Sequence, residues 1–174
     1  MAFRIDRIPR FPFTDNTLFL ALALGALAID AGGFGLQTFL KLAPCPLCIF
    51  QRVIYLTLTA LGLIGLLLPF HAIRQFLGYL VLSLGLVGLG TAGYQTWMQA
   101  FPEQFTNACN YTEPNLIEQF VDWLGMIEPT LFMASGLCTS KAWTLFGLSM
   151  ANWSSITFLL ITLLSAWRIS QPKR

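Results

Sequence analysis

The sequence predicts an all-α membrane protein: a four-helix transmembrane bundle with one short and one long extracytoplasmic loop. Hydrophobic residues make up 56% of the 174 residues and charged residues only 10%, whereas a soluble domain carries about a quarter charged residues. Four apolar stretches are each long enough to supply the roughly 20 helical residues that a bilayer requires. The net charge of +2 is too small to indicate a nucleic-acid-binding protein.

The four expected spans cover about residues 17–40, 49–70, 76–98 and 148–167, so that the whole chain, 1–174, forms one membrane domain. Each span is expected to be a helix, because the bilayer core offers the backbone no other hydrogen-bonding partner. The extracytoplasmic loops cover about residues 41–48 and 99–146.

The long loop contains a segment, Leu116 to Ile127, in which apolar residues recur at helical spacing. Thr112 or Asn115 is suited to cap its start. We expect a short amphipathic helix lying at the membrane interface, although the same pattern also fits a helix packed on the bundle.

The basic residues predict the orientation of the bundle. Seven of the ten lie on one side of a four-span arrangement: Arg4, Arg7, Arg10, Arg74, Arg168, Lys173 and Arg174. The other side has Lys41, Lys141 and Arg52, together with five acidic residues. Because cytoplasmic loops carry the excess of Lys and Arg, both termini are expected in the cytoplasm.

All four cysteines then lie outside the cytoplasm, where disulfides persist. Cys45 and Cys48 belong to the connection between the first two spans, and Cys109 and Cys138 to the long loop. A zinc site made by the four cysteines and a set of purely structural disulfides are the alternatives. No metal is expected, because an oxidising compartment competes for the thiols.

The motif Cys45-Pro-Leu-Cys48 stands where a helix begins, since prolines favour the first helical turn. The free amides and the positive dipole end of that turn would stabilise a Cys48 thiolate, the reactive form of cysteine. Arg52 lies one turn further along the same face. A cation within the membrane edge indicates a functional residue, although snorkelling to the interface is the alternative. Asp30 is interpreted as a helix-packing contact.

With these residues in place, the sequence resembles the bacterial disulfide bond formation protein DsbB family over essentially its whole length. The resemblance is carried by three stretches and by the second cysteine pair, Cys109 and Cys138. The stretches are Pro44-Cys-Pro-Leu-Cys-Ile-Phe-Gln-Arg52, Ala134-Ser-Gly-Leu-Cys138 and Trp143-Thr-Leu-Phe-Gly-Leu-Ser-Met150.

The resemblance implies a thiol:quinone oxidoreductase in the bacterial inner membrane, with its cysteine loops in the periplasm. A reduced thioredoxin-like DsbA-type protein would form a mixed disulfide with Cys109, the partner of Cys138. Electrons would then pass by exchange from Cys138 to Cys45, and Cys48 would face a quinone (ubiquinone or menaquinone) beside Arg52. Sulfur exchange requires direct contact, so one pair must meet the soluble partner and the other must lie at the membrane.

Two further residues are assigned to the quinone site through the resemblance. Trp143 matches a family position close to the quinone. Gln95 stands where some members have a histidine, which argues against a proton-donating role but leaves a hydrogen bond to a quinone carbonyl.

Two other functions remain open at this stage. One is a dedicated oxidase for a different thiol partner, and the other is a non-enzymatic membrane scaffold with structural disulfides. Reduction of added quinone by a thiol donor would separate the enzyme from the scaffold.

Overall fold

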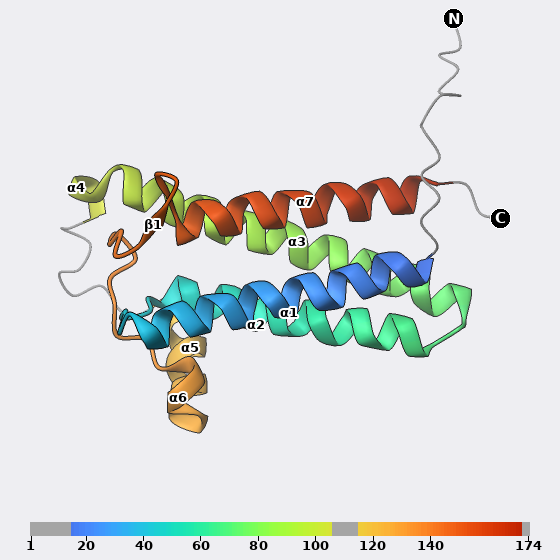
Figure 1. Cartoon of the computed structure of the whole chain (residues 1–174), viewed down its shortest axis with the longest axis horizontal. Helices are drawn as coiled ribbons and strands as arrows, with labels where there is room; N and C mark the ends of the chain where they lie inside the picture. Colours follow the sequence, from blue (N-terminus) through green and yellow to red (C-terminus); the bar gives the residue numbers. More distant parts are fainter. Residues whose placement is uncertain (1–14, 106–114, 172–174) are drawn as a thin grey trace, which may run out of the picture.

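The computed structural model describes residues 15–105 and 115–171, and four long helices dominate it (Figure 1). These are α1 (Asp15–Phe39), α2 (Pro46–Leu67), α3 (His71–Ala100) and α7 (Met150–Ser170). Each is long and apolar enough to cross a membrane, and many large apolar side chains point away from the bundle. The predicted fold class, a four-helix membrane bundle, is confirmed.

The helix ends differ from the expected spans in ways that local sequence explains. The second helix starts at Pro46 rather than near residue 49, because Cys45 is its N-cap and proline occupies the first helical turn. The third is longer than expected, covering His71–Ala100. The fourth starts at Met150 rather than near residue 148, because Ser149 caps it.

The helices pack as two pairs, α1 on α2 and α3 on α7, and α2 also contacts α3. Small residues let them approach closely, as is usual between membrane helices. A Cβ on Gly62 of α2 would lie 2.9 Å from the Cβ of Ala23 in α1. Tyr55 and Phe158 stack in the core with ring centroids 4.5 Å apart, and Phe158 lies against Gly88. The Tyr55–Phe158 stack joins the two pairs, because Tyr55 belongs to α2 and Phe158 to α7.

The long loop folds into short elements: α4 (Pro102–Phe105), α5 (Leu116–Ile127), α6 (Pro129–Phe132), and the strands β1 (Thr144–Leu145) and β2 (Leu148–Ser149). The expected short helix is present as α5. Asn115 caps it in a reciprocal capping box with Glu118, whereas Thr112 lies outside the described residues. Val121 is fully buried, so α5 packs on the bundle, beside α2.

One end of the bundle carries all the described cysteines. The short α1–α2 connection and the long α3–α7 connection meet there (Figure 1). The start of α1, the end of α7 and the α2–α3 connection lie at the opposite end. The chain's functional candidates are thereby separated from Arg74 and Arg168 by the length of the helices.

Candidate functional site

Two cysteine sulfurs face each other at the N-terminus of α2. Cys45 is the N-cap residue and is buried, and its sulfur accepts a hydrogen bond from the Cys48 amide at 3.3 Å. The Cys45 and Cys48 sulfurs are 2.8 Å apart, and both are free thiols. The helix geometry that the two prolines favour therefore holds the two sulfurs in contact.

The third described cysteine comes to the same place from the long loop. The Cys138 side chain hydrogen-bonds to Cys45. The amides of Ser135 and Gly136 both donate to the Pro44 carbonyl at 2.9 Å, which fixes the two loops to each other. Cys109 lies outside the described residues.

The hydrogen bond between Cys45 and Cys138 shifts the pKa values of the two thiols in opposite directions. With the Cys45 thiol as donor to Cys138 and Cys48, and with burial adding to the effect, the pKa of Cys45 lies far above its ordinary value. The same bond, accepted from Cys45, lowers the pKa of Cys138. Cys138 is therefore the better nucleophile of the two.

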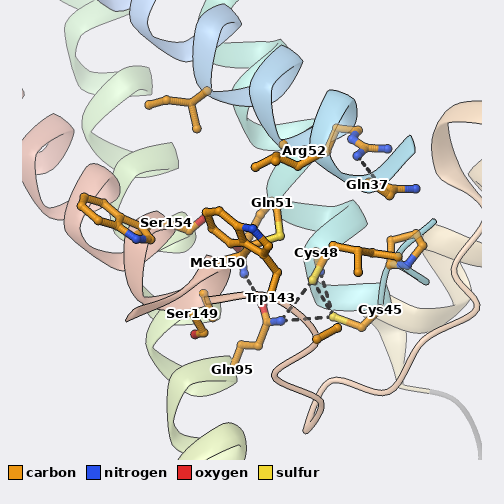
Figure 2. Close-up of a pocket in the computed structure, with 18 of the residues that line it drawn as sticks. Gln37, Cys45, Cys48, Gln51, Arg52, Gln95, Trp143, Ser149, Met150 and Ser154 are labelled. Atoms are coloured by element: carbon orange, nitrogen blue, oxygen red, sulfur yellow. Dashed lines mark hydrogen bonds between the residues drawn. The ribbon is translucent and has the colours of Figure 1, made fainter. Parts of the chain in front are cut away.

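Gln95 of α3 lies directly against the cysteine pair. Its Nε2 donates to the Cys45 sulfur at 3.2 Å and to the Cys48 sulfur at 3.1 Å. Its Oε1 accepts from Gln51 Nε2 at 2.9 Å, and both glutamines are almost fully buried. Because Gln51 occupies the oxygen, the NH2 of Gln95 is directed at the sulfurs (Figure 2).

Arg52 of α2 is held by two other elements, α1 and α6. Its Nη1 donates to the Leu131 carbonyl of α6 and its Nη2 to Gln37 Oε1 of α1, both at 2.6 Å. Its Nε lies 3.4 Å from Asp30 Oδ1, and the guanidinium lies 5.0 Å from the centre of the Phe34 ring. A buried arginine with these partners is a fixed, desolvated cation and does not snorkel.

A cavity of about 390 Å³ connects these groups. It is bordered by α1, α2, α3 and α7 and by the loop that contains Trp143, and most of its wall is apolar. Cys45, Cys48, Arg52, Gln95 and Trp143 all line it, and Figure 2 shows Trp143 between the helices that carry them. Of the described residues that the sequence assigned to the site, all but Cys138 thus line one cavity, and Cys138 is hydrogen-bonded to Cys45.

The cavity also includes residues that sequence reasoning missed. Asp30 was interpreted as a packing contact, yet it lines the cavity and pairs with Arg52. Gln37, Gln51 and the Leu131 carbonyl were not anticipated. For Asp30 a signal existed, because an acidic residue within a membrane span is costly unless it is paired.

A second polar network holds the loop next to Trp143. Ser149 Oγ donates to Gln99 Oε1 at 2.5 Å, and Gln99 Nε2 donates to the Ser140 carbonyl at 3.1 Å. Among the described residues, no group of three or more His, Cys, Asp or Glu side chains is arranged to hold a metal ion.

The fold and the site define a multi-pass membrane protein with a dithiol centre beside an apolar cavity. The family model for "Disulfide bond formation protein DsbB" matches residues 15–168. The chain therefore belongs to the DsbB family, a family of membrane proteins for disulfide bond formation, and it is accordingly an oxidoreductase.

Curated relatives agree with the family match. Disulfide bond formation protein B of Dechloromonas aromatica is 54% identical over 140 residues, which cover 80% of this chain and 83% of that protein. The protein of the same name from Azoarcus sp. is 35% identical over 160 residues, covering 90% of this chain and 93% of the relative. The chain thus matches its relatives over most of their length.

Proposed function

We propose that this chain is a protein-dithiol:quinone oxidoreductase of the bacterial inner membrane. It reoxidises a periplasmic thioredoxin-like protein of the DsbA type and passes the electrons to a membrane quinone, either ubiquinone or menaquinone. In this way it sustains disulfide formation in secreted proteins. Both chain termini are in the cytoplasm and the cysteine loops are in the periplasm.

The contact of three sulfurs, two of which line an apolar cavity, is the observation that carries the proposal. Cys138 comes from the loop that would meet a soluble partner, and it hydrogen-bonds to Cys45. Cys48 lines the cavity within the bundle. Because exchange between disulfides needs direct sulfur contact, this arrangement supports a path from water to membrane.

The proposed exchange proceeds through these sulfurs in order. The partner's thiolate attacks Cys109, and the Cys109–Cys138 disulfide opens. The Cys138 thiolate then attacks Cys45, the Cys45–Cys48 disulfide breaks, and Cys48 leaves as a thiolate. The partner's second cysteine displaces Cys109 and leaves with its own disulfide closed, and Cys109 then displaces Cys45 from Cys138. The Cys109–Cys138 disulfide is thereby restored, and Cys45 is released and protonated to the thiol. Cys48 is a good leaving group because it lies in the first turn of α2, where free amides and the helix dipole favour a thiolate.

The cavity suits a quinone as the electron-accepting substrate. Its volume of about 390 Å³ is within the usual range for small-molecule sites, and such sites combine an apolar wall with a few polar groups. A quinone ring has two carbonyl oxygens that accept hydrogen bonds. Gln95 and Arg52 are donors on different sides of Cys48 (Figure 2), and Trp143 supplies an aromatic wall.

A quinone is also needed for the direction of electron flow. A DsbA-type protein is itself strongly oxidising, with a potential of about −120 mV, and each 30 mV of uphill transfer costs about 1.4 kcal/mol. An ordinary protein disulfide would not oxidise it.

Purified protein, a reduced DsbA-type donor and a short-chain quinone test the proposal. The wild type is expected to reduce the quinone, and Cys45→Ser and Cys48→Ser are each expected to abolish this activity. Ser83→Ala, on the exposed side of α3, is the matched control that should retain it. Undiminished quinone reduction in both cysteine variants would overturn the mechanism.

The same assay separates the rival functions. A wild type that reduces quinone with another thiol donor but not with a DsbA-type donor would indicate a dedicated oxidase for a different partner. A wild type that is inactive with every donor would indicate a scaffold with structural disulfides.

A further inference from the structure

Asp30 is a partly buried acidic residue to which the exchange mechanism gives no role. It lies within the membrane span of α1, its side chain is 13% exposed, and it is the only acidic side chain among the described residues that line the cavity. An ionisable residue inside a membrane span is a candidate for a functional role, most often in moving protons.

The surroundings of Asp30 leave it one strong partner. Arg52 Nε lies 3.4 Å from its Oδ1, while the other two nitrogens of the guanidinium are engaged by the neutral oxygens of Leu131 and Gln37. Arg52 also interacts electrostatically with Cys48, which precedes it by one helical turn. One permanent cation thus stands between two groups that can each become an anion.

Asp30 and Cys48 share one cation, so they cannot both be anions without an uncompensated charge. With the Cys45–Cys48 disulfide closed, the Asp30 carboxylate and Arg52 are neutral as a pair. When the disulfide opens and Cys48 becomes a thiolate, the cavity gains a second negative charge for the same cation. An uncompensated charge in an apolar site is costly, and the usual relief is that one group binds a proton.

We propose that Asp30 is the proton-holding residue of the cavity: it is protonated while Cys48 is a thiolate, and it delivers this proton to the quinone when the cysteines reoxidise. The inference rests on the proposed function, because the quinone is the proton acceptor. Asp30 lies beside Arg52 and Cys45 lies against Cys48, so the cavity has two proton sources for the two quinone oxygens.

The step balances in atoms and electrons. The Cys45 thiol, the Cys48 thiolate, the protonated Asp30 and the quinone become the Cys45–Cys48 disulfide, the Asp30 carboxylate and the quinol. The S–H bond of Cys45 and the O–H bond of Asp30 break, and one S–S and two O–H bonds form. Two electrons move from the sulfurs to the quinone. Asp30 then pairs with Arg52 again.

The other titratable groups that face this site are few among the described residues. Arg52, Cys48 and Tyr55 come from α2, and Lys141 comes from the loop. The α7 side contributes the neutral hydroxyls of Ser154 and Thr157. Tyr55 is the one other group that can give up a proton at the Arg52 side, so it is the natural control.

Infrared difference spectra of quinone-free protein, before and after reduction with dithiothreitol, test the inference directly. The carbonyl stretch of a protonated carboxylic acid is expected to appear on reduction. It is expected to vanish in Asp30→Asn and to persist, shifted in frequency, in Asp30→Glu. Tyr55→Phe, which keeps the stacked ring, is expected to retain the band. A band that survives in Asp30→Asn, or no band in the wild type, would overturn the inference.

A kinetic measurement adds a second readout. Asp30→Asn keeps the size and hydrogen-bonding capacity of the side chain, and it is expected to slow quinone reduction about 100-fold, the usual scale for a lost proton donor. It should also flatten the pH profile of that step, while exchange with the reduced partner continues at the wild-type rate. Equal slowing of both steps with an unchanged pH profile would show a structural role for Asp30.

The two readouts separate this inference from the proposed function. If the wild type reduced no quinone, the proposed function would fail, and the inference, which requires a quinone to accept the proton, would fail with it. If the wild type reduced quinone and Asp30→Asn did so equally fast, without a carboxylic acid band in either, the proposed function would stand and the inference alone would be wrong.

Discussion

At the scale of single residues, the hydrogen bond between Cys45 and Cys138 decides which of the two thiols loses its proton more readily. Cys45 gives its proton to the shared bond, and Cys138 accepts it. The thiolate is the nucleophilic form, so in this dithiol state Cys138 is the more reactive of the two sulfurs.

Removing the Cys45 donor should therefore change the pH dependence of Cys138. A lowered pKa means that Cys138 loses its proton at lower pH than an ordinary thiol, so its alkylation by iodoacetamide should set in at lower pH than in the denatured protein. In Cys45→Ala the onset should move up in pH, and in Cys45→Ser, which keeps a donor, it should move less. Site-resolved mass spectrometry across a pH series measures this, and identical profiles in all three proteins would contradict it.

Arg52 contacts both the cavity and the loop that continues to Cys138. Its guanidinium lines the cavity, but Nη1 also holds the Leu131 carbonyl of the loop that continues to Cys138. Arg52→Ala should raise the apparent KM for a short-chain quinone, and it should also slow exchange with the partner, by less. Arg52→Lys keeps the charge but not the planar guanidinium group. It should therefore raise the KM for quinone and slow partner exchange, each by less than Arg52→Ala does. An Arg52→Ala variant with wild-type partner exchange would show that the Leu131 contact does not order the loop.

At the scale of elements, the contact between the two loops depends on one position without a side chain. A Cβ on Gly136 would overlap the Ala43 carbonyl, because the backbone of Ala43 and Pro44 lies against this glycine. Both Gly136 and its neighbour Ser135 donate to the Pro44 carbonyl. The segment with Cys138 can lie on the Cys45 loop only because this glycine lets two backbones touch.

Gly136→Ala should accordingly separate Cys138 from Cys45 while leaving the cavity intact. With Cys48→Ser and Cys109→Ser in the same chain, Cys45 and Cys138 should form a disulfide on mild oxidation, and Gly136→Ala should reduce its yield severalfold. Gly35→Ala, where a Cβ would meet nothing within 4 Å, is the matched control. An undiminished yield in Gly136→Ala would show that the loops meet by another route.

The elements differ in how far the sequence predicted them. Apolar runs predicted four membrane helices, and Asn115 with the periodic residues after it predicted α5, because these signals are local. The hairpin before α7 was missed, since its strands have two residues each and depend on positive φ angles at Phe146 and Gly147. The Asp30–Arg52 pair was also missed, because the packing of α1 on α2, and not sequence distance, brings them together.

At the scale of the whole molecule, the bundle places the cysteines and the connection that contains Arg74 at opposite ends of its long axis. All the described cysteines are at one end, and the connection through His71 and Arg74 is at the other (Figure 1). Cys48 lines the cavity that α1, α2, α3 and α7 border, while Cys138 stays on a loop. The direction in which the bundle is inserted therefore determines which compartment the cysteines face.

The excess of basic residues near His71 and at the termini predicts that the cysteine end faces the periplasm. In a chain with all four cysteines changed to serine, Lys141→Cys should react with a membrane-impermeant maleimide applied to intact cells, because Lys141 is exposed at the cysteine end. His71→Cys, exposed at the opposite end, should react only after the cells are permeabilised. Labelling of His71→Cys but not Lys141→Cys in intact cells would reverse the orientation. The cysteines would then face the reducing cytoplasm, where their disulfides would not persist.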